Sequence, residues 1–220
     1  AGTLKANNRF GLHLGGNFYN ADWATMESVG GLTIDAGRIE NGNGARINSA
    51  NTVLNSRGDV VNRGRIEGDN LAISGGRVEN TGTLIGDTIT VRAWDLTNGA
   101  DFGGVADNAA YQSALIAATR KVSLLVGGTF LNRDALVFSM GDIFIAANEA
   151  AGRTIQITNH SGDIEADGSI LLAANQITNQ RRVFETDTYV LNAAEQLANR
   201  HATDNIVRYR YDDPDPTHQP

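Results

Sequence analysis

Apolar and polar residues alternate in short runs along most of this 220-residue chain. Leu71 and Ile73 are separated by one residue, and Ile143 and Ile145 repeat the arrangement. Successive side chains of a β-strand point to opposite faces, so this alternation is typical of strands with one buried face. Gly and Asn separate the runs, and both tolerate the positive φ that a corner between strands requires. The pattern predicts many short strands joined by tight corners.

The alternating runs recur with a period near 20 residues. Each unit places a large apolar residue two positions before an asparagine, as in the two QITN stretches that end at Asn159 and Asn179. Successive anchors are 21, 21, 18, 18, 34, 27, 20 and 20 residues apart. Such a period indicates a solenoid. The nine anchors are Asn20, Asn41, Asn62, Asn80, Asn98, Asn132, Asn159, Asn179 and Asn199.

Strand periodicity within each unit predicts an all-β fold, a parallel β-helix of about nine to ten coils. Stacked strands lie about 4.8 Å apart, so one asparagine per coil would form a column whose side-chain amides bond to those above and below. We therefore predict a structural role for the nine anchors. A leucine-rich repeat also contains an asparagine, but it requires a fuller pattern of spaced leucines that this chain lacks.

The interval of 34 between Asn98 and Asn132 predicts an insertion over residues 99–121. Its second half, from Asn108 to Arg120, has helical spacing, which predicts a short helix packed against the solenoid. This helix would either cover part of the core or contact a partner, because loops on rigid scaffolds often carry function. The candidate partner contacts are Tyr111, Gln112, Arg120 and Lys121.

Two further features concern the organisation of the chain. The interval of 27 before Asn159 predicts a smaller insertion around Asn148–Arg153. After Asn199 the periodicity fades, and the last ten residues contain three Asp and three Pro. We therefore predict one β-helical domain over residues 1–210, followed by an extended acidic tail over residues 211–220.

Composition narrows the classes of function. The net charge is −7 and no basic stripe is present, which argues against a nucleic-acid or anionic-membrane partner. The absence of Cys excludes disulfides and thiolate metal sites. No apolar run reaches the roughly 18 residues that a spanning helix needs. We expect a monomer with no cofactor.

Three short motifs match functional sites only in part. The Arg57–Asp59 stretch is an RGD adhesion tripeptide, but its glycine also serves a turn. The Asp163–Gly168 stretch begins like a calcium loop, yet the expected twelfth-position Glu is Ala174. His160, Ser161 and Asp163 have the composition of a hydrolase triad, but residues so close in sequence rarely assemble one.

The other chemistry-bearing residues form no cluster in the sequence. His13, His201 and His218 are scattered, so we expect no metal site. The sequence leaves open a pair of sugar-cleaving carboxylates on adjacent coils, because any two acidic residues at equivalent positions of neighbouring coils would be close together.

The units GRVENTGTLIGDTITVRAWDLTN and GSILLAANQITN resemble the haemagglutinin-type repeats of filamentous haemagglutinin and of contact-dependent growth inhibition exoproteins. The resemblance spans roughly Leu12 to Asn199. It implies a segment of a very long protein exported by two-partner secretion, which folds outside the cell as a right-handed parallel β-helical filament. It also implies a place at the bacterial cell surface or in the medium, and an outer-membrane transporter as a partner during export.

Two functions are consistent with these observations. The first is a non-catalytic segment of such an exoprotein, either an adhesin or a toxin-delivery protein. This segment would act as a filament or stalk and would contact a protein or glycan receptor on a neighbouring or host cell. The alternative is a carbohydrate-active enzyme, a polysaccharide lyase or hydrolase on a β-helix. That enzyme would need a groove with clustered acids, basic residues and aromatic sugar platforms.

Overall fold

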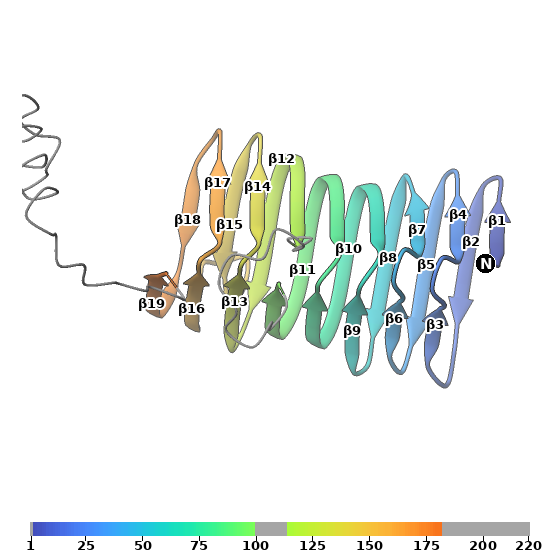
Figure 1. Cartoon of the computed structure of the whole chain (residues 1–220), viewed down its shortest axis with the longest axis horizontal. Helices are drawn as coiled ribbons and strands as arrows, with labels where there is room; N and C mark the ends of the chain where they lie inside the picture. Colours follow the sequence, from blue (N-terminus) through green and yellow to red (C-terminus); the bar gives the residue numbers. More distant parts are fainter. Residues whose placement is uncertain (1, 100–113, 182–220) are drawn as a thin grey trace, which may run out of the picture. The chain divides into compact units, whose positions relative to one another are not determined.

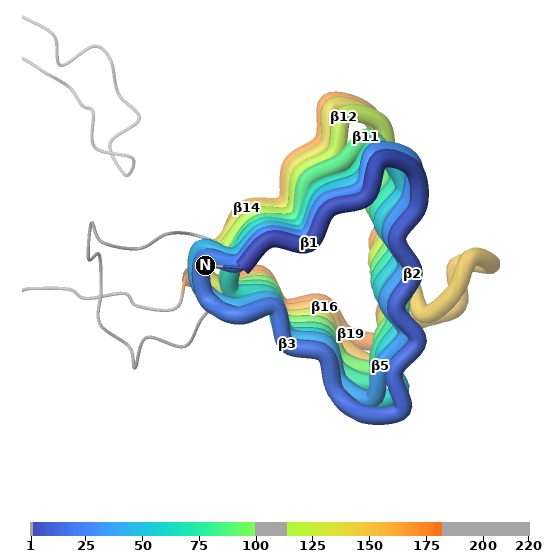
Figure 2. The backbone as a smooth tube through the Cα atoms, turned by 90° about the vertical axis from the view of Figure 1, so that its right-hand side faces the viewer, coloured from blue at the N-terminus to red at the C-terminus, as the bar shows by residue number. Residues whose placement is uncertain are grey.

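The computed structural model of the chain describes residues 2–99 and 114–181. In these ranges every regular element is a β-strand, and neighbouring strands pair in parallel. The strands wind into a solenoid whose coils stack side by side (Figure 1). Seen from the N-terminal end, the chain runs clockwise as it recedes from the viewer, so the β-helix is right-handed (Figure 2). The predicted fold class is therefore confirmed.

Three parallel sheets form the sides of a roughly triangular cross-section (Figure 2). We name them sheets 1, 2 and 3 in the order in which each coil crosses them. Three long strands bend through the corners and contribute to more than one sheet: β10 (Arg65–Asn80), β11 (Thr83–Asn98) and β12 (Leu115–Val126).

The remaining strands each belong to one sheet. Sheet 1 contains β1 (Thr3–Ala6), β4 (Thr25–Ser28), β7 (Arg46–Ser49), β14 (Leu136–Ser139) and β17 (Asp163–Ala166). Sheet 2 contains β2 (Arg9–His13), β5 (Gly31–Ala36), β8 (Asn51–Ser56), β15 (Asp142–Ala146) and β18 (Ile170–Leu172). Sheet 3 contains β3 (Phe18–Asn20), β6 (Ile39–Asn41), β9 (Asp59–Asn62), β13 (Thr129–Arg133), β16 (Thr154–His160) and β19 (Ala174–Gln180).

The core is a set of aliphatic columns that run along the axis of the solenoid. One column belongs to sheet 1, where equivalent inward-facing side chains of successive coils are register partners and are fully buried. Each buried side chain of this size contributes about 1.5–3 kcal/mol of hydrophobic stabilisation. Alternation in the sequence thus places the apolar side chains of every coil on one continuous core. The column contains Ile47, Ile66, Leu84, Ile116 and Val137.

The prediction of a helix in the insertion is wrong for the part of that segment that the structure describes. Leu115–Arg120 lies in β12, which pairs with β11 on one side and with β14 on the other. Ile116 and Ala118 point into the core, so backbone pairing and burial together outweigh the helical preference of this alanine-containing stretch. Residues 100–113 lie outside the described ranges.

The described residues account for eight of the predicted nine to ten coils. Each of these eight coils contains one of the anchors from Asn20 to Asn179. The ninth anchor, Asn199, lies outside the described residues, as do the predicted domain end at residue 210 and the tail. The smaller insertion has the predicted place, because residues 147–153 form a loop between β15 and β16.

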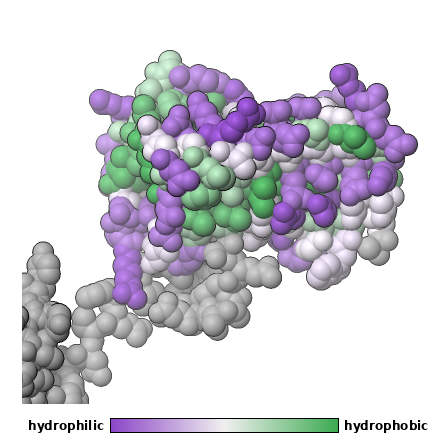
Figure 3. All heavy atoms as spheres, turned by 90° about the horizontal axis from the view of Figure 1, so that it is seen from above, coloured by the Kyte–Doolittle hydropathy of each residue, from purple (hydrophilic) through white to green (hydrophobic). Residues whose placement is uncertain are grey.

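The outermost coils are less covered than the central ones. Phe18 in the first coil is only partly buried, and Ile177 in the last described coil is 51% exposed although its partner Ile157 is fully buried. Apolar surface also gathers toward the C-terminal coils in the view from above (Figure 3). Large exposed side chains in these coils include Met140, Ile170 and Leu171.

Candidate functional site

The asparagine anchors form one hydrogen-bonded ladder through the solenoid. In each step, the Nδ2 of one asparagine donates to the Oδ1 of the asparagine in the next coil. The seven distances from Asn20 to Asn179 are 2.8, 2.9, 2.8, 2.8, 2.9, 2.8 and 3.0 Å. The structure thus aligns eight of the nine predicted anchors. The ninth, Asn199, lies outside the described residues.

The ladder amides also bond to the backbone. Asn80, which is 0% exposed, donates from Nδ2 to the backbone oxygen of Leu115 at 3.1 Å as well as to Asn98. Asn62 makes the equivalent pair of bonds, to Thr83 and to Asn80. Because the amide groups of Asn62 and Asn80 are buried and bonded on both sides, they stabilise the stack and are not accessible to a ligand.

The four predicted partner contacts do not form one described patch. Arg120 and Lys121 are exposed residues of β12, next to a bulge where the pairing with β11 shifts register. The Lys121 Nζ lies 5.6 Å from the centre of the Phe144 ring, a cation–π distance. Tyr111 and Gln112 lie outside the described residues.

The RGD tripeptide forms the corner between β8 and β9. The Arg57 guanidinium donates to the backbone oxygens of Leu14 and Gly15 at 3.0 and 2.9 Å. Asp59 pairs with Arg38 at 3.4 Å. Both side chains therefore bond within the solenoid, which is consistent with a structural turn.

The other two motifs serve as strand and corner as well. The Asp163–Gly168 stretch comprises β17 and a turn whose Gly168 N–H donates to the Gly141 oxygen at 3.0 Å. Within residues 2–99 and 114–181, no group of three or more His, Asp or Glu side chains could hold a metal ion. The imidazole of His160 contacts Gln180 of the next coil at 2.8 Å.

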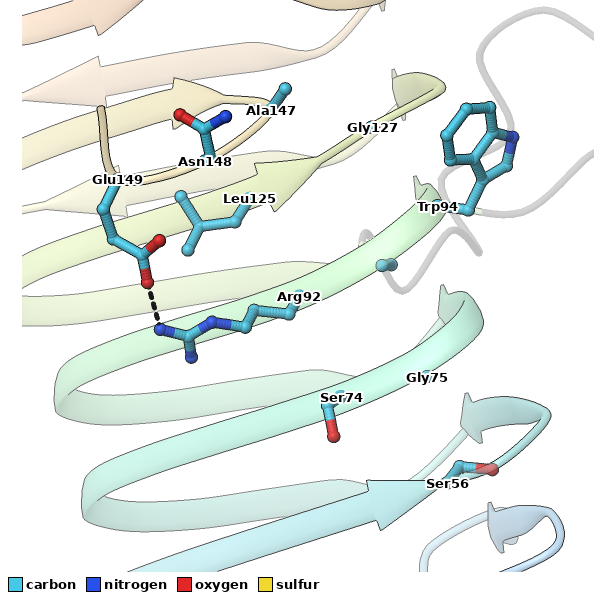
Figure 4. Close-up of a pocket in the computed structure, with 11 residues that line it drawn as sticks. Ser56, Ser74, Gly75, Arg92, Trp94, Leu125, Gly127, Ala147, Asn148 and Glu149 are labelled. Atoms are coloured by element: carbon cyan, nitrogen blue, oxygen red, sulfur yellow. Dashed lines mark hydrogen bonds and ion pairs between the residues drawn. The ribbon is translucent and has the colours of Figure 1, made fainter. Parts of the chain in front are cut away.

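A pocket that the sequence did not reveal lies at the corner between sheets 2 and 3. It is a hollow of about 450 Å³ beside the 147–153 loop, which projects from the solenoid (Figure 2). In the close-up, Trp94 lies at one end, and the Arg92–Glu149 pair lies at the other, with Leu125 beside the pair (Figure 4). We call this hollow the Trp94 pocket. Its lining comprises Ser56, Ser74, Gly75, Arg92, Ala93, Trp94, Leu125, Gly127, Ala147, Asn148 and Glu149.

Trp94 occupies a corner position at which neighbouring coils have glycine. It lies opposite Gly76 of the preceding coil and Gly127 of the following one. A Cβ at Gly127 would be 2.9 Å from the indole ring, so only glycine lets the ring lie against this backbone. The Gly128 N–H also donates to the Trp94 backbone oxygen at 2.7 Å. Trp94 is nevertheless 61% exposed, which leaves much of its ring open to solvent.

The opposite end of the Trp94 pocket is closed by an ion pair. Arg92, on β11, donates to Glu149 of the 147–153 loop, and the pair bridges over Leu125 of β12. This hydrogen bond lowers the pKa of the Glu149 carboxyl below its ordinary value. Leu125 is an outward-facing strand residue, yet it is only 5% exposed. The loop and the ion pair therefore cover part of sheet 2.

Hydrogen bonds within the 147–153 loop define its shape. The Asn148 Oδ1 accepts from the N–H groups of Ala150 and Gly152 at 3.0 and 3.1 Å. The Ala147 N–H donates to the Gly152 oxygen at 2.7 Å, and Ala151 has a positive φ of 58°. The loop is thus a compact turn that presents Asn148 and Glu149 to the Trp94 pocket.

A smaller hollow of about 130 Å³ lies on the other side of the ion pair. Lys121 and Phe144 line it, together with Arg92, Leu125 and Glu149, which line both hollows. One of the four predicted partner contacts, Lys121, is therefore a neighbour of the Trp94 pocket. In the sequence, Trp94 follows Gly76 by 18 residues, the same interval that separates Asn80 from Asn98. An outward-facing position nevertheless carries no packing pattern that would mark it.

Comparison with protein-family models, with curated proteins and with solved structures gives no match. The described residues contain no helix long and apolar enough to cross a membrane. The class of protein that the fold defines is a right-handed parallel β-solenoid with an internal asparagine ladder.

Proposed function

We propose that this chain is a non-catalytic β-helical segment of a large secreted bacterial surface exoprotein, an adhesin or a contact-dependent growth inhibition effector. In this proposal the segment is a filament or stalk, exported through a two-partner outer-membrane transporter and acting as a monomer. It contacts a protein or glycan receptor on a neighbouring or host cell.

The ladder of eight asparagines is the observation that carries the proposal. The first six coils repeat the same buried amide, and aliphatic columns run through them, so the interior favours extension along one axis rather than formation of an enclosed active site. The partly covered side chains of the outermost coils support the same reading, because another coil stacked on them would bury their apolar surface.

The alternative, a carbohydrate-active enzyme, is supported by an exposed aromatic residue, but the Trp94 pocket has no second carboxyl group. The exposed Trp94 is an aromatic platform of the kind such an enzyme needs. Glycoside hydrolysis normally requires two carboxyl groups, of which one must hold a proton near neutral pH. The Trp94 pocket is lined by a single carboxylate, Glu149, whose pKa is lowered by the hydrogen bond from Arg92. Its lining therefore suits binding better than cleavage.

The test is to measure binding of the purified segment to intact bacterial and host cells, beside an assay for polysaccharide degradation. Saturable cell binding without degradation is the expected result. Degradation of any polysaccharide, or no binding to any cell tested, would contradict the proposal.

A deletion variant examines the insertion within the same experiment. In the preceding coil, two residues link Asn80 to Thr83, and joining Gly99 directly to Ala114 would restore an equally short link between Asn98 and Leu115. The deletion must end before β12, because a longer one would remove a paired strand. If the insertion carries the receptor contact, removal of residues 100–113 will abolish cell binding while the β-type circular dichroism is retained.

A further inference from the structure

We propose that the Trp94 pocket binds an uncharged oligosaccharide, with one sugar ring stacked on the indole and the hydroxyl groups of another ring bonded by Arg92 and Glu149 at the opposite end. The binding site itself is independent of the parent protein. Its biological meaning, a glycan as the receptor, rests on the function proposed above.

The indole of Trp94 is exposed and positioned so that a sugar ring can stack on it. Trp94 is 61% exposed, and it is held at a corner where the next coil places Gly127 against its ring. A pyranose ring has an apolar face of C–H groups, and stacking that face on an indole removes apolar surface from water on both partners. Because the corner already positions the indole against the backbone, little side-chain freedom remains to be lost on binding.

The charge of the pocket favours an uncharged ligand. Arg92 and Glu149 are the only ionisable residues among those that line it, and they neutralise each other. The lowered pKa of Glu149 keeps its carboxylate ionised at neutral pH. An anionic ligand would compete with Glu149 for Arg92, whereas a neutral one leaves the pair intact.

The ion pair also supplies the right hydrogen-bonding groups. A guanidinium has five N–H donors, and a carboxylate accepts through two oxygens, so their adjacent edges can bond neighbouring hydroxyls as acceptor and donor. Both groups lie at the end of the pocket opposite Trp94 (Figure 4). An apolar platform faced by a few polar groups is the usual composition of a small-molecule site, and about 450 Å³ lies within the usual range of volumes, roughly 300–1,000 Å³.

The chain contains an internal control for the role of Trp94. Its only other tryptophan, Trp23, is 70% exposed and also lies against a glycine of the next coil, Gly44. Trp23 does not line the Trp94 pocket. Removing each indole in turn therefore separates the pocket from a general effect of exposed aromatic surface.

The experiment is a fluorescence titration. In the Trp23→Phe variant, Trp94 is the single tryptophan and reports directly on the pocket. The probes are lactose, maltotriose, chitotriose and mannotriose as neutral saccharides, and sialyllactose and a heparin tetrasaccharide as anionic ones. At least one neutral probe should change the Trp94 emission saturably. Calorimetry with that probe should show affinity reduced at least about tenfold by Trp94→Ala, unchanged by Trp23→Ala, and partly retained by Trp94→Tyr.

The assignment would be overturned by no response to any neutral probe, by binding that survives Trp94→Ala, or by a response to the anionic probes alone. A protein ligand would be shown if Trp94→Ala reduced binding to cells even after periodate oxidation of their glycans, and that too would overturn it. If the saccharides fail but the segment still binds cells, only the glycan site is wrong. If a saccharide binds but no cell does, the proposed receptor contact is wrong.

Discussion

Residues in the interior of the solenoid repeat from coil to coil, whereas those at its outer corner around Trp94 occur once. Inside, the first six coils repeat the same elements, a buried asparagine and columns of aliphatic side chains. At the outer corner one coil replaces a glycine position with Trp94, and a later coil adds the 147–153 loop. A repeated interior stabilises the stack, but it presents the same chemistry at every level. Selective binding therefore has to come from positions that occur once.

The largest expected effect lies in the interior. Replacing Asn80 by Ala removes its bonds to Asn62, Asn98 and Leu115 and leaves buried polar groups without partners. We expect a loss of roughly 3 kcal/mol in the free energy of unfolding, measured by denaturant titration. Asn70→Ala, at an exposed position of the same coil, should change it by less than about 0.5 kcal/mol. Equal losses in the two variants would remove the distinction between interior and surface.

A smaller effect is expected where the corner meets the next coil. The Gly127→Ala variant places a Cβ 2.9 Å from the Trp94 ring, so the indole must move. We expect a loss of about 1 kcal/mol and a shifted tryptophan emission in the Trp23→Phe background. For Gly76→Ala the nearest atom is 3.6 Å away, which is ordinary contact. Gly76→Ala should therefore leave the Trp94 emission unchanged. If the Trp23→Phe parent and both glycine variants made in it gave identical emission spectra, the placement of Trp94 against Gly127 would be contradicted.

The ion pairs of the outer faces predict a dependence on pH. Burial acts to raise the pKa of Glu67, but the hydrogen bonds and charges of Arg65 and Arg46 outweigh it and lower the pKa from 4.5. A carboxyl group whose pKa is lower in the folded than in the unfolded protein stabilises the fold at pH values above the unfolded-state pKa. This stabilisation is lost as the pH falls through the folded-state pKa. The melting temperature of the wild type should therefore exceed that of Glu67→Gln near neutral pH, and the difference should shrink below pH 4.5. If the difference in melting temperature between the two proteins grew on acidification, the predicted direction of the Glu67 pKa shift would be contradicted.

The smallest effect concerns the exposed Arg92–Glu149 pair, which holds the 147–153 loop. Glu149→Gln should let the loop open more often and raise the rate of tryptic cleavage after Arg153, roughly two- to fivefold. Glu79→Gln removes another ion pair, with Arg77, that does not touch the loop. Its cleavage rate after Arg153 should equal that of the wild type. If both variants are cleaved alike, the pair does not hold the loop.

Most of the fold was predictable because its determinants repeat. The alternation of apolar residues and the spacing of the asparagines both reflect packing between coils, so they recur wherever a coil occurs. The insertion at residues 147–153 was predictable as a break in that spacing. The segment Leu115–Arg120 was mispredicted because its alanine-containing composition suits a helix, whereas its neighbours on both sides provide strand partners.

The Trp94 pocket could not be predicted in the same way. Trp94 and Arg92 lie on β11, whereas Glu149 lies on a loop two coils later, so the pocket depends on the stacking of the coils. Outward-facing positions are not constrained by packing, so no periodic pattern marks them. Sequence reasoning placed the binding surface at Tyr111, Gln112, Arg120 and Lys121. The first two lie outside the described residues, and of the other two the structure brings Lys121 to the neighbouring hollow.

Hydrogen exchange of the asparagine side chains tests the central claim, that a buried amide ladder organises the repeated interior. With isotopically labelled asparagine, nuclear magnetic resonance reports each side-chain amide separately. We expect slow exchange for the buried amides of Asn41, Asn62, Asn80, Asn98 and Asn132, and fast exchange for the exposed Asn51, Asn55 and Asn70. Exchange of both groups at the same fast rate would contradict it.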